Sequence, residues 1–190
     1  MTITAALPVL ALVLLFPAAA PTQGISSDLT ARTPVTFTGG FDTDPRDGGR
    51  PVALIAAALN VPAEVFRKAF SAVRPAPAGQ EPEPEQVRRD KQALMSALGP
   101  YGVTNELLDK VSNYYRYSRS QGEMWRHTPA TAYATVRNGV VTFTIANPGS
   151  GYSSPPKVTI AGMADLKVTA SLSFAADFSK NGSIKEIAAR

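Results

Sequence analysis

The stretch ATVRNGVVTFTIANPGSGYSSPPKVTI, residues 134–160, decides the fold class of the second half of this chain. Apolar and polar residues alternate on both sides of Asn138-Gly139, and Asn-Gly is the dipeptide that two-residue hairpin turns prefer. A loop rich in Gly, Ser and Pro comes next, and a short apolar run ends the stretch. The pattern predicts antiparallel strands over 132–136, 141–145 and 157–160.

The residues downstream continue the same pattern. Apolar side chains occupy every second position from Leu166 to Phe174, which predicts a half-buried strand. A second Asn-Gly pair, Asn181-Gly182, predicts another turn, and Ile184 to Ile187 predicts the last strand. Both Asn-Gly pairs follow an alternating segment, so the tail is interpreted as one repeat and the start of a second.

Upstream of this tail, apolar residues recur at helical spacing instead. Pro51, Pro62 and Thr104 are well placed to begin helices, and Gly99-Pro100 is well placed to end one. These signals predict about four helices in two helix-turn-helix pairs. The expected helices cover 52–59, 63–73, 85–98 and 105–115.

The chain is therefore predicted to be an α+β protein, with an N-terminal helical unit followed by a small antiparallel β module. The helical domain is expected over 51–120 with a proline-rich linker at 74–85, and the β module over 128–190. Residues 25–50 are rich in Ser, Thr, Gly, Asp and Pro and show no sustained periodicity. They are predicted to be a flexible leader.

The first 24 residues have the pattern of a secretory signal peptide. Ala5 to Ala20 carries no charged side chain and is shorter than the roughly 20 apolar residues of a spanning helix. Thr22-Gln23-Gly24 supplies small residues for cleavage before Ile25. An uncleaved anchor is the alternative, since no basic residue precedes the apolar run. We expect a secreted, periplasmic or cell-envelope protein that meets the membrane only through this peptide during export.

Composition limits the function further. The chain has no cysteine, so disulfides and thiolate metal sites are excluded. Its 19 Lys and Arg against 15 Asp and Glu leave a net charge of +4, a modest excess that predicts weak attraction to anionic surfaces. Nucleic acid is not an expected partner for an exported protein, and no cofactor is expected. Cell-envelope polysaccharide or another envelope protein is the expected partner.

Gly149-Ser150-Gly151-Tyr152 and Pro155-Pro156, with the hairpin before them, carry a family resemblance. Residues 130–190 resemble the GxGY-type β-repeat of phage tail and virion proteins and of bacterial surface proteins. The resemblance implies an antiparallel module used for structure or attachment, without catalysis. The second copy ends at Arg190 before its own Gly-Tyr loop, which implies a single module. The whole chain is also similar to uncharacterised exported bacterial proteins of planctomycete type.

A cluster of aromatic and basic residues is the candidate ligand site. Arg116, Tyr117, Arg119 and Trp125 could bind an anionic cell-wall glycan, because aromatic faces stack on sugars and guanidinium groups pair with anions. Trp125 could instead pack the helices onto the sheet. Tyr152 has the same two interpretations, as a stacking residue or as a cover for one end of the sheet.

Two further groups could carry chemistry. Asp42, Asp44 and Asp47 form a weak calcium candidate, although their spacing does not fit an EF-hand, and an interpretation as a turn leading into the first helix stays open. His127 is the only histidine and lies in no nucleophile-elbow motif. We therefore predict no enzyme but a structural or binding module, with anionic glycan binding as an alternative and a small envelope hydrolase using these aspartates as a third.

Overall fold

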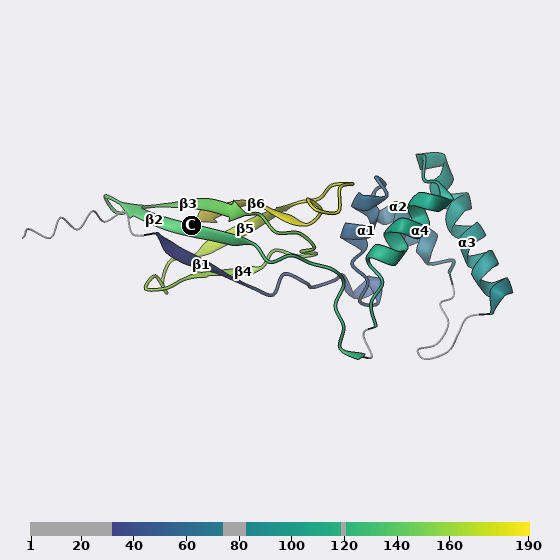
Figure 1. Ribbon diagram of the computed structural model, residues 1–190, viewed down its shortest axis with the longest axis horizontal. Coiled ribbons are helices and arrows are strands. Elements are labelled where there is room, and N and C mark those ends of the chain that lie inside the picture. The colour runs from purple at the N-terminus through teal and green to yellow at the C-terminus, as the bar shows by residue number, and fades with distance from the viewer. Residues whose placement is uncertain (1–31, 74–82, 119–120) are drawn as a thin grey trace, which may run out of the picture.

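The computed structural model describes residues 32–73, 83–118 and 121–190, and it confirms the α+β class. A β module and a helical unit lie end to end along the long axis of the molecule (Figure 1). The helices and short 3-10 segments are η1 (Pro45–Asp47), α1 (Val52–Ala58), α2 (Ala63–Phe70), α3 (Pro84–Leu98), η2 (Gly99–Tyr101) and α4 (Asn105–Tyr114). The strands are β1 (Thr33–Thr38), β2 (Thr131–Arg137), β3 (Val140–Asn147), β4 (Lys157–Ile160), β5 (Val168–Ser173) and β6 (Ser183–Ala189).

The helical unit contains the four predicted helices around one apolar core. Thr104 caps α4 as expected, because its side-chain oxygen accepts a hydrogen bond from the Leu107 backbone N–H at 3.2 Å. The core side chains come from every helix, and they include Leu54, Phe66, Leu98 and Val111. α3 begins at Pro84, inside the predicted linker 74–85, since proline fits the first helical turn. Residues 74–82 of that linker lie outside the described residues.

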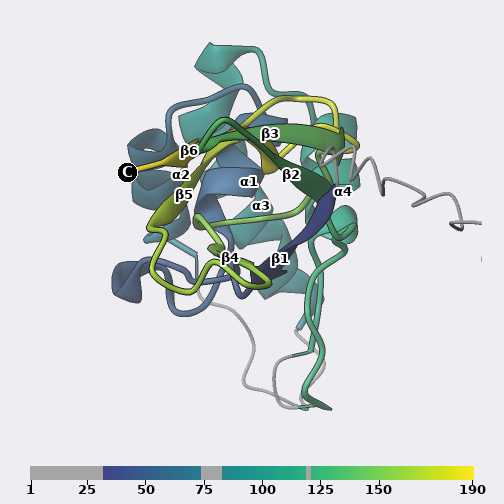
Figure 2. The ribbon, with the colours of Figure 1, turned by 90° about the vertical axis from the view of Figure 1, so that its left-hand side faces the viewer.

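The β module is built from two antiparallel sheets. The larger sheet has the strand order β3-β2-β1-β4, and the smaller one pairs β5 with β6. Asn138 and Gly139 join β2 to β3 with φ of 50° and 77°, as a type I′ hairpin turn requires, so this predicted hairpin is confirmed. β4 lies beside β5 and β3 beside β6, so the strands surround a single apolar core (Figure 2).

β1 corrects the prediction of a flexible leader over 25–50. Residues 33–38 form a strand inside the larger sheet, antiparallel to β2 on one side and to β4 on the other. Val35 is buried and Phe37 packs partly against the core, while Thr36 and Thr38 are exposed. The helical unit is thus inserted between β1 and β2. Residues 25–31 lie outside the described residues.

Asn181 joins the two halves of the molecule. Its side chain is fully buried, and its Nδ2 donates to the Leu54 carbonyl oxygen at 2.7 Å and to the Tyr115 hydroxyl oxygen at 2.9 Å. Its Oδ1 accepts a hydrogen bond from the Ala175 N–H at 3.2 Å. The predicted turn at Asn181-Gly182 is present, and it forms the end of a longer connection, 174–182, between β5 and β6.

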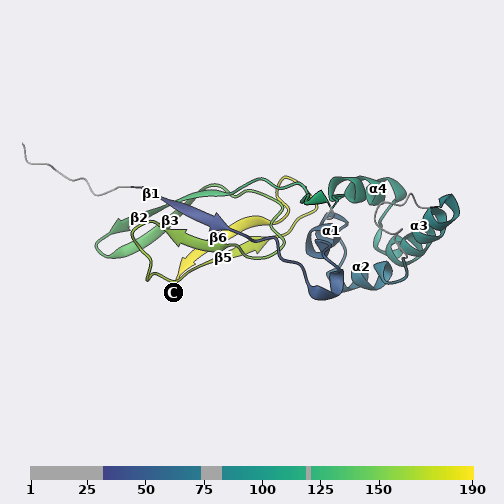
Figure 3. The same ribbon diagram turned by 90° about the horizontal axis from the view of Figure 1, so that it is seen from below.

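Within the β module, the loop 149–152 is fastened to the segment that carries Asn181. Two backbone hydrogen bonds join it to the Asn181-Gly182 segment, from Gly151 N–H at 2.8 Å and from Tyr152 N–H at 3.0 Å. Gly182 has a φ of 66°, and a methyl group there would lie 2.3 Å from the Tyr152 carbonyl oxygen. Seen from below, these loops fill the region where the β module meets α1 and α4 (Figure 3).

Candidate ligand-binding groove

A groove of about 500 Å³ opens in the helical unit, and we call it the arginine groove. Its lining residues come from the turn before α1, from α1 itself, from α2 and from the end of α4: Gly48, Arg50, Pro51, Ile55, Phe66, Phe70, Ser112, Tyr115, Arg116 and Tyr117. The walls are mostly aromatic and aliphatic, and among the described lining residues the charged ones are two arginines, Arg50 and Arg116. The volume lies within the roughly 300–1,000 Å³ of small-molecule sites.

Arg50 is held in place by the surrounding backbone and by an aromatic ring. Its guanidinium carbon lies 4.2 Å from the centroid of the Phe70 ring, within the range of a cation–π contact. Its Nη1 donates to the Asp47 carbonyl oxygen at 3.2 Å. Among the described residues no carboxylate pairs with Arg50, so its charge is available to an anion.

Arg116 lies at the opposite sequence end of the helical unit, just after α4. Its side chain is exposed, and within the described part of the chain it has neither a hydrogen bond nor an ion pair. The neighbouring Tyr117 donates a hydrogen bond from its hydroxyl to the Gly49 carbonyl oxygen, which ties the α4 end of the groove to the turn before α1. The groove therefore carries two positive charges that no described carboxylate neutralises.

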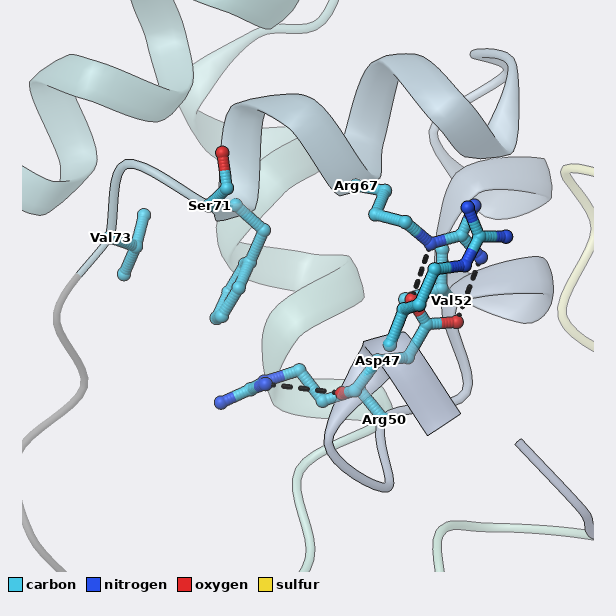
Figure 4. Close-up of a pocket in the computed structure, with 8 residues that line it drawn as sticks. Asp47, Arg50, Val52, Arg67, Ser71 and Val73 are labelled. Carbon is cyan, nitrogen blue, oxygen red and sulfur yellow. Dashed lines mark hydrogen bonds and ion pairs between the residues drawn. The ribbon is translucent and has the colours of Figure 1, made fainter. Parts of the chain in front are cut away.

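A second hollow of about 280 Å³ adjoins the arginine groove and shares Arg50 and Phe70 with it. Its other lining residues are Arg46, Asp47, Val52, Arg67, Ser71 and Val73 (Figure 4). We call it the paired hollow, because its other arginines are already paired with acids. Asp47 is buried and binds Arg67 through both oxygens, at 2.5 Å to Nε and 2.9 Å to Nη2.

These contacts shift the pKa values of the charged groups in the paired hollow. Hydrogen bonding to Asp47, and to a smaller degree to Glu64, raises the pKa of Arg67 above its usual range. Asp44 binds Arg46 side chain to side chain at 2.6 Å, and this contact holds the pKa of the Asp44 carboxyl well below its usual range. The local acids therefore largely neutralise Arg46 and Arg67.

The structure brings only two of the predicted glycan-binding residues to one open site. Arg116 and Tyr117 line the arginine groove, while Arg119 lies outside the described residues. Trp125 is 3% exposed, and its Nε1 donates to the Gly151 carbonyl oxygen at 2.9 Å. The ring packs the helical unit against the β module, which agrees with the packing interpretation of Trp125 and not with ligand stacking.

Tyr152 is likewise an interior residue. Its ring stacks on Phe41 at a centroid distance of 5.3 Å, and its hydroxyl oxygen accepts a hydrogen bond from the Ala130 N–H at 3.0 Å. With 4% of its surface exposed, it cannot stack on a ligand, and it covers the end of the sheet that faces the helices. The packing interpretation of this residue agrees with its position.

The three aspartates of the calcium candidate are engaged elsewhere. Asp44 and Asp47 bind Arg46 and Arg67, and Asp42 Oδ2 accepts a hydrogen bond from the Ser154 hydroxyl at 3.1 Å. Across residues 32–73, 83–118 and 121–190, no three His, Asp or Glu side chains gather closely enough to hold a metal ion. A cation at Asp44 and Asp47 would have to compete with two bound guanidinium groups.

Sequence reasoning missed Arg50 and Phe70, which join the two hollows. Arg50 directly precedes the helix-starting Pro51, and Phe70 has the helical spacing of an apolar face, so neither residue stands out in the sequence. One signal in the sequence could have indicated that Arg50 has no acidic partner: α1 holds no acidic residue one helical turn away from it. His127 is an exposed residue beside Phe41, with ring centroids 4.8 Å apart.

Comparison with protein-family models finds no match for this chain. Comparisons with curated proteins and with solved structures find no match either. In the described segments, each helix is too short or too polar to cross a bilayer. The geometry of the arginine groove is accordingly the basis for assigning a ligand.

Proposed function

We propose that this protein is a non-catalytic, exported binding module that takes an anionic glycan of the cell envelope in its arginine groove. One observation carries the proposal: Arg50 and Arg116 line the same aromatic-walled groove, and neither pairs with a described carboxylate. Arginine suits this task because its planar guanidinium group pairs with a carboxylate through two hydrogen bonds. Aromatic walls suit the apolar faces of sugar rings.

The chemistry of the lining supports binding over turnover. Glycoside hydrolysis requires two carboxyl groups on either side of the scissile bond. None of the described residues that line the arginine groove is an acid or a histidine. The aspartates of the hydrolase alternative are held by Arg46, Arg67 and Ser154, which leaves that alternative without support.

Export and attachment to the envelope rest on the sequence. The apolar run Ala5 to Ala20 and the cleavage pattern before Ile25 support secretion, and the β-repeat resemblance of 130–190 supports a place at the cell surface. A module at that surface meets acidic polysaccharide at high local concentration. Weak binding to each repeat is then sufficient, because one polymer presents many repeats to the groove at high local concentration.

Calorimetric titration with polygalacturonate, a carboxylated polymer, tests the proposal, with neutral dextran as the reference. We expect measurable binding to polygalacturonate that weakens as salt is added, and none to dextran. Arg116→Gln should weaken binding about tenfold, since it removes one charge-assisted contact of about 1.4 kcal/mol.

Arg137→Gln is the matched control for this titration. Arg137 is also an exposed arginine, but it lies in the β2–β3 hairpin of the β module, outside the arginine groove. Its removal lowers the net charge by the same amount and should leave the affinity almost unchanged. If both variants weaken binding equally, the attraction is a property of overall charge and the groove assignment fails.

A further inference from the structure

We infer that the arginine groove and the paired hollow together recognise a linear glycan in which carboxylated and uncharged rings alternate. This inference rests on the proposed function and specifies its ligand. The carboxylated ring lies in the arginine groove, and the uncharged ring that follows it lies in the paired hollow. The bond between the two rings crosses the pair formed by Arg50 and Phe70.

The two hollows are adjacent parts of one track. Arg50 and Phe70 line both of them, so the cation–π pair at 4.2 Å is the partition between them. Phe70 also contacts Phe66, with ring centroids 5.7 Å apart and an interplanar angle of 34°. A chain that lies across this partition meets an apolar ring and a guanidinium group at the same point.

The difference in charge between the two hollows decides the order of the rings. In the arginine groove the charges of Arg50 and Arg116 have no described carboxylate partner. In the paired hollow, Arg67 faces Asp47 at 2.5 Å and Glu64 at contact distance, while Arg46 faces Asp44 at 2.6 Å. A carboxylate bound in the paired hollow would therefore lie beside acids that already occupy the arginines.

The rest of the paired hollow fits an uncharged ring. Ser71 lies at its edge and is exposed, and Val52 and Val73 supply apolar surface (Figure 4). Its volume of about 280 Å³ is smaller than that of the arginine groove. A uniformly acidic chain would gain binding free energy in the arginine groove. It would lose part of this free energy in the paired hollow through repulsion from Asp47, since like charges at short range are unfavourable.

Calorimetric titration of the full chain with three tetrasaccharides tests the inference. The first alternates glucuronate with N-acetylglucosamine, the second is tetragalacturonate, and the third is neutral chitotetraose. We expect the alternating chain to bind about tenfold more tightly than tetragalacturonate, which corresponds to about 1.4 kcal/mol. Chitotetraose should give no measurable heat.

Ser71→Trp fills the paired hollow and separates the two sites. It should remove the preference for the alternating tetrasaccharide while leaving the binding of free glucuronate unchanged, because the arginine groove is intact. Ser96→Trp is the control, since Ser96 is also an exposed serine that donates to a carbonyl of its own helix, at 2.9 Å to Gln92. Circular dichroism verifies that both variants are folded.

The outcomes separate the inference from the proposed function. Equal affinity for the alternating and the uniformly acidic tetrasaccharides overturns the inference and leaves the proposed function standing. The same holds if Ser71→Trp keeps the preference. If neither acidic tetrasaccharide binds, the proposed function fails together with the inference. Tight binding of chitotetraose would overturn both, because it would show that charge is irrelevant to the site.

Discussion

At the scale of single residues, Asn181 is the side chain whose removal should weaken the packing of both halves of the molecule. Its amide satisfies the Leu54 carbonyl and the Tyr115 hydroxyl, and it accepts from the Ala175 N–H. Asn181→Ala leaves two buried polar groups and one partly buried N–H without this partner, and each such group costs about 1 kcal/mol or more. We expect the free energy of unfolding, measured by urea denaturation, to fall by about 3 kcal/mol.

Asn138→Ala is a matched control, because Asn138 also precedes a glycine but lies on the surface. Its φ of 50° favours asparagine over alanine, so the expected loss is about 1 kcal/mol. Equal losses in the two variants would show that Asn181 acts only as a turn residue. A larger loss for Asn181→Ala supports its role as the buried link between helices and strands.

Tyr115 gives the protein a predictable dependence on alkaline pH. Burial raises the pKa of its hydroxyl to about 12, and the hydrogen bond from Asn181 offsets part of this effect. The ordinary pKa of about 10 applies in the unfolded chain, so the native state keeps a proton that the unfolded state loses. The stability that this group contributes is complete below pH 10 and is lost as the pH rises towards 12.

Thermal unfolding of the wild-type protein and of Tyr115→Phe at several pH values between 9 and 12 measures this effect. The wild-type melting temperature should decrease more steeply above pH 10 than that of the variant, which has no hydroxyl at this site. Tyr101→Phe serves as the control, because Tyr101 is 49% exposed. Parallel curves for wild type and Tyr115→Phe would contradict the prediction.

At the scale of elements, the ion pair between Asp47 and Arg67 fastens η1 to α2 and so positions Arg50. Asp47→Asn leaves the partly buried Arg67 with Glu64 as its nearest acid. We expect a loss of about 2 kcal/mol in unfolding free energy, less than for a fully buried pair because solvent reaches Arg67. Urea denaturation measures it, and binding to polygalacturonate should weaken as well, since Arg50 loses its fixed position.

Two further variants test the cause of that loss. Asp44→Asn breaks an exposed pair and should change stability little. The double variant Asp47→Leu with Arg67→Met replaces both charges with apolar groups and should recover part of the stability of Asp47→Asn. If the double variant is the less stable protein, the ion pair itself, and not the cost of an unpaired charge, is what stabilises the contact.

Local signals in the sequence predicted elements well wherever one residue decides the backbone. Thr104 begins α4, and Asn138-Gly139 joins β2 to β3, because a cap or a turn depends on its own side chain and conformation. The strand β1 was missed, since its six residues gain their stability from strands far away in the sequence. Its signal was weak but present, as Val35 and Phe37 alternate with threonines.

The candidate site was predictable only in part, for a related reason. Arg116 and Tyr117 were found because aromatic and basic residues are adjacent in the sequence. Arg50 and Phe70 reach the same groove from other elements, so that only the tertiary structure brings them together. For Trp125 and Tyr152 the sequence left packing and ligand stacking open, and the burial of both at the junction between helices and strands agrees with packing.

At the scale of the whole molecule, β1 makes the β module depend on residues that precede the helices. A chain that begins at Pro51 lacks the strand between β2 and β4 and leaves two strand edges unpaired. Unpaired edges are templates for association, so this truncated chain should form oligomers in size-exclusion chromatography. A chain that begins at Ile25 keeps β1 and should be monomeric in the same measurement, and oligomers of both chains alike would contradict the role of β1.

The position of β1 also sets the order in which the molecule can fold. Val35 pairs with Ala132, roughly 100 residues later in the chain, and such distant pairs form slowly because the chain entropy of the intervening loop must be lost first. The helices between them make mostly local contacts and can form early. We expect their folding to shorten the effective distance between β1 and β2, so that the inserted helical unit brings these two strands together.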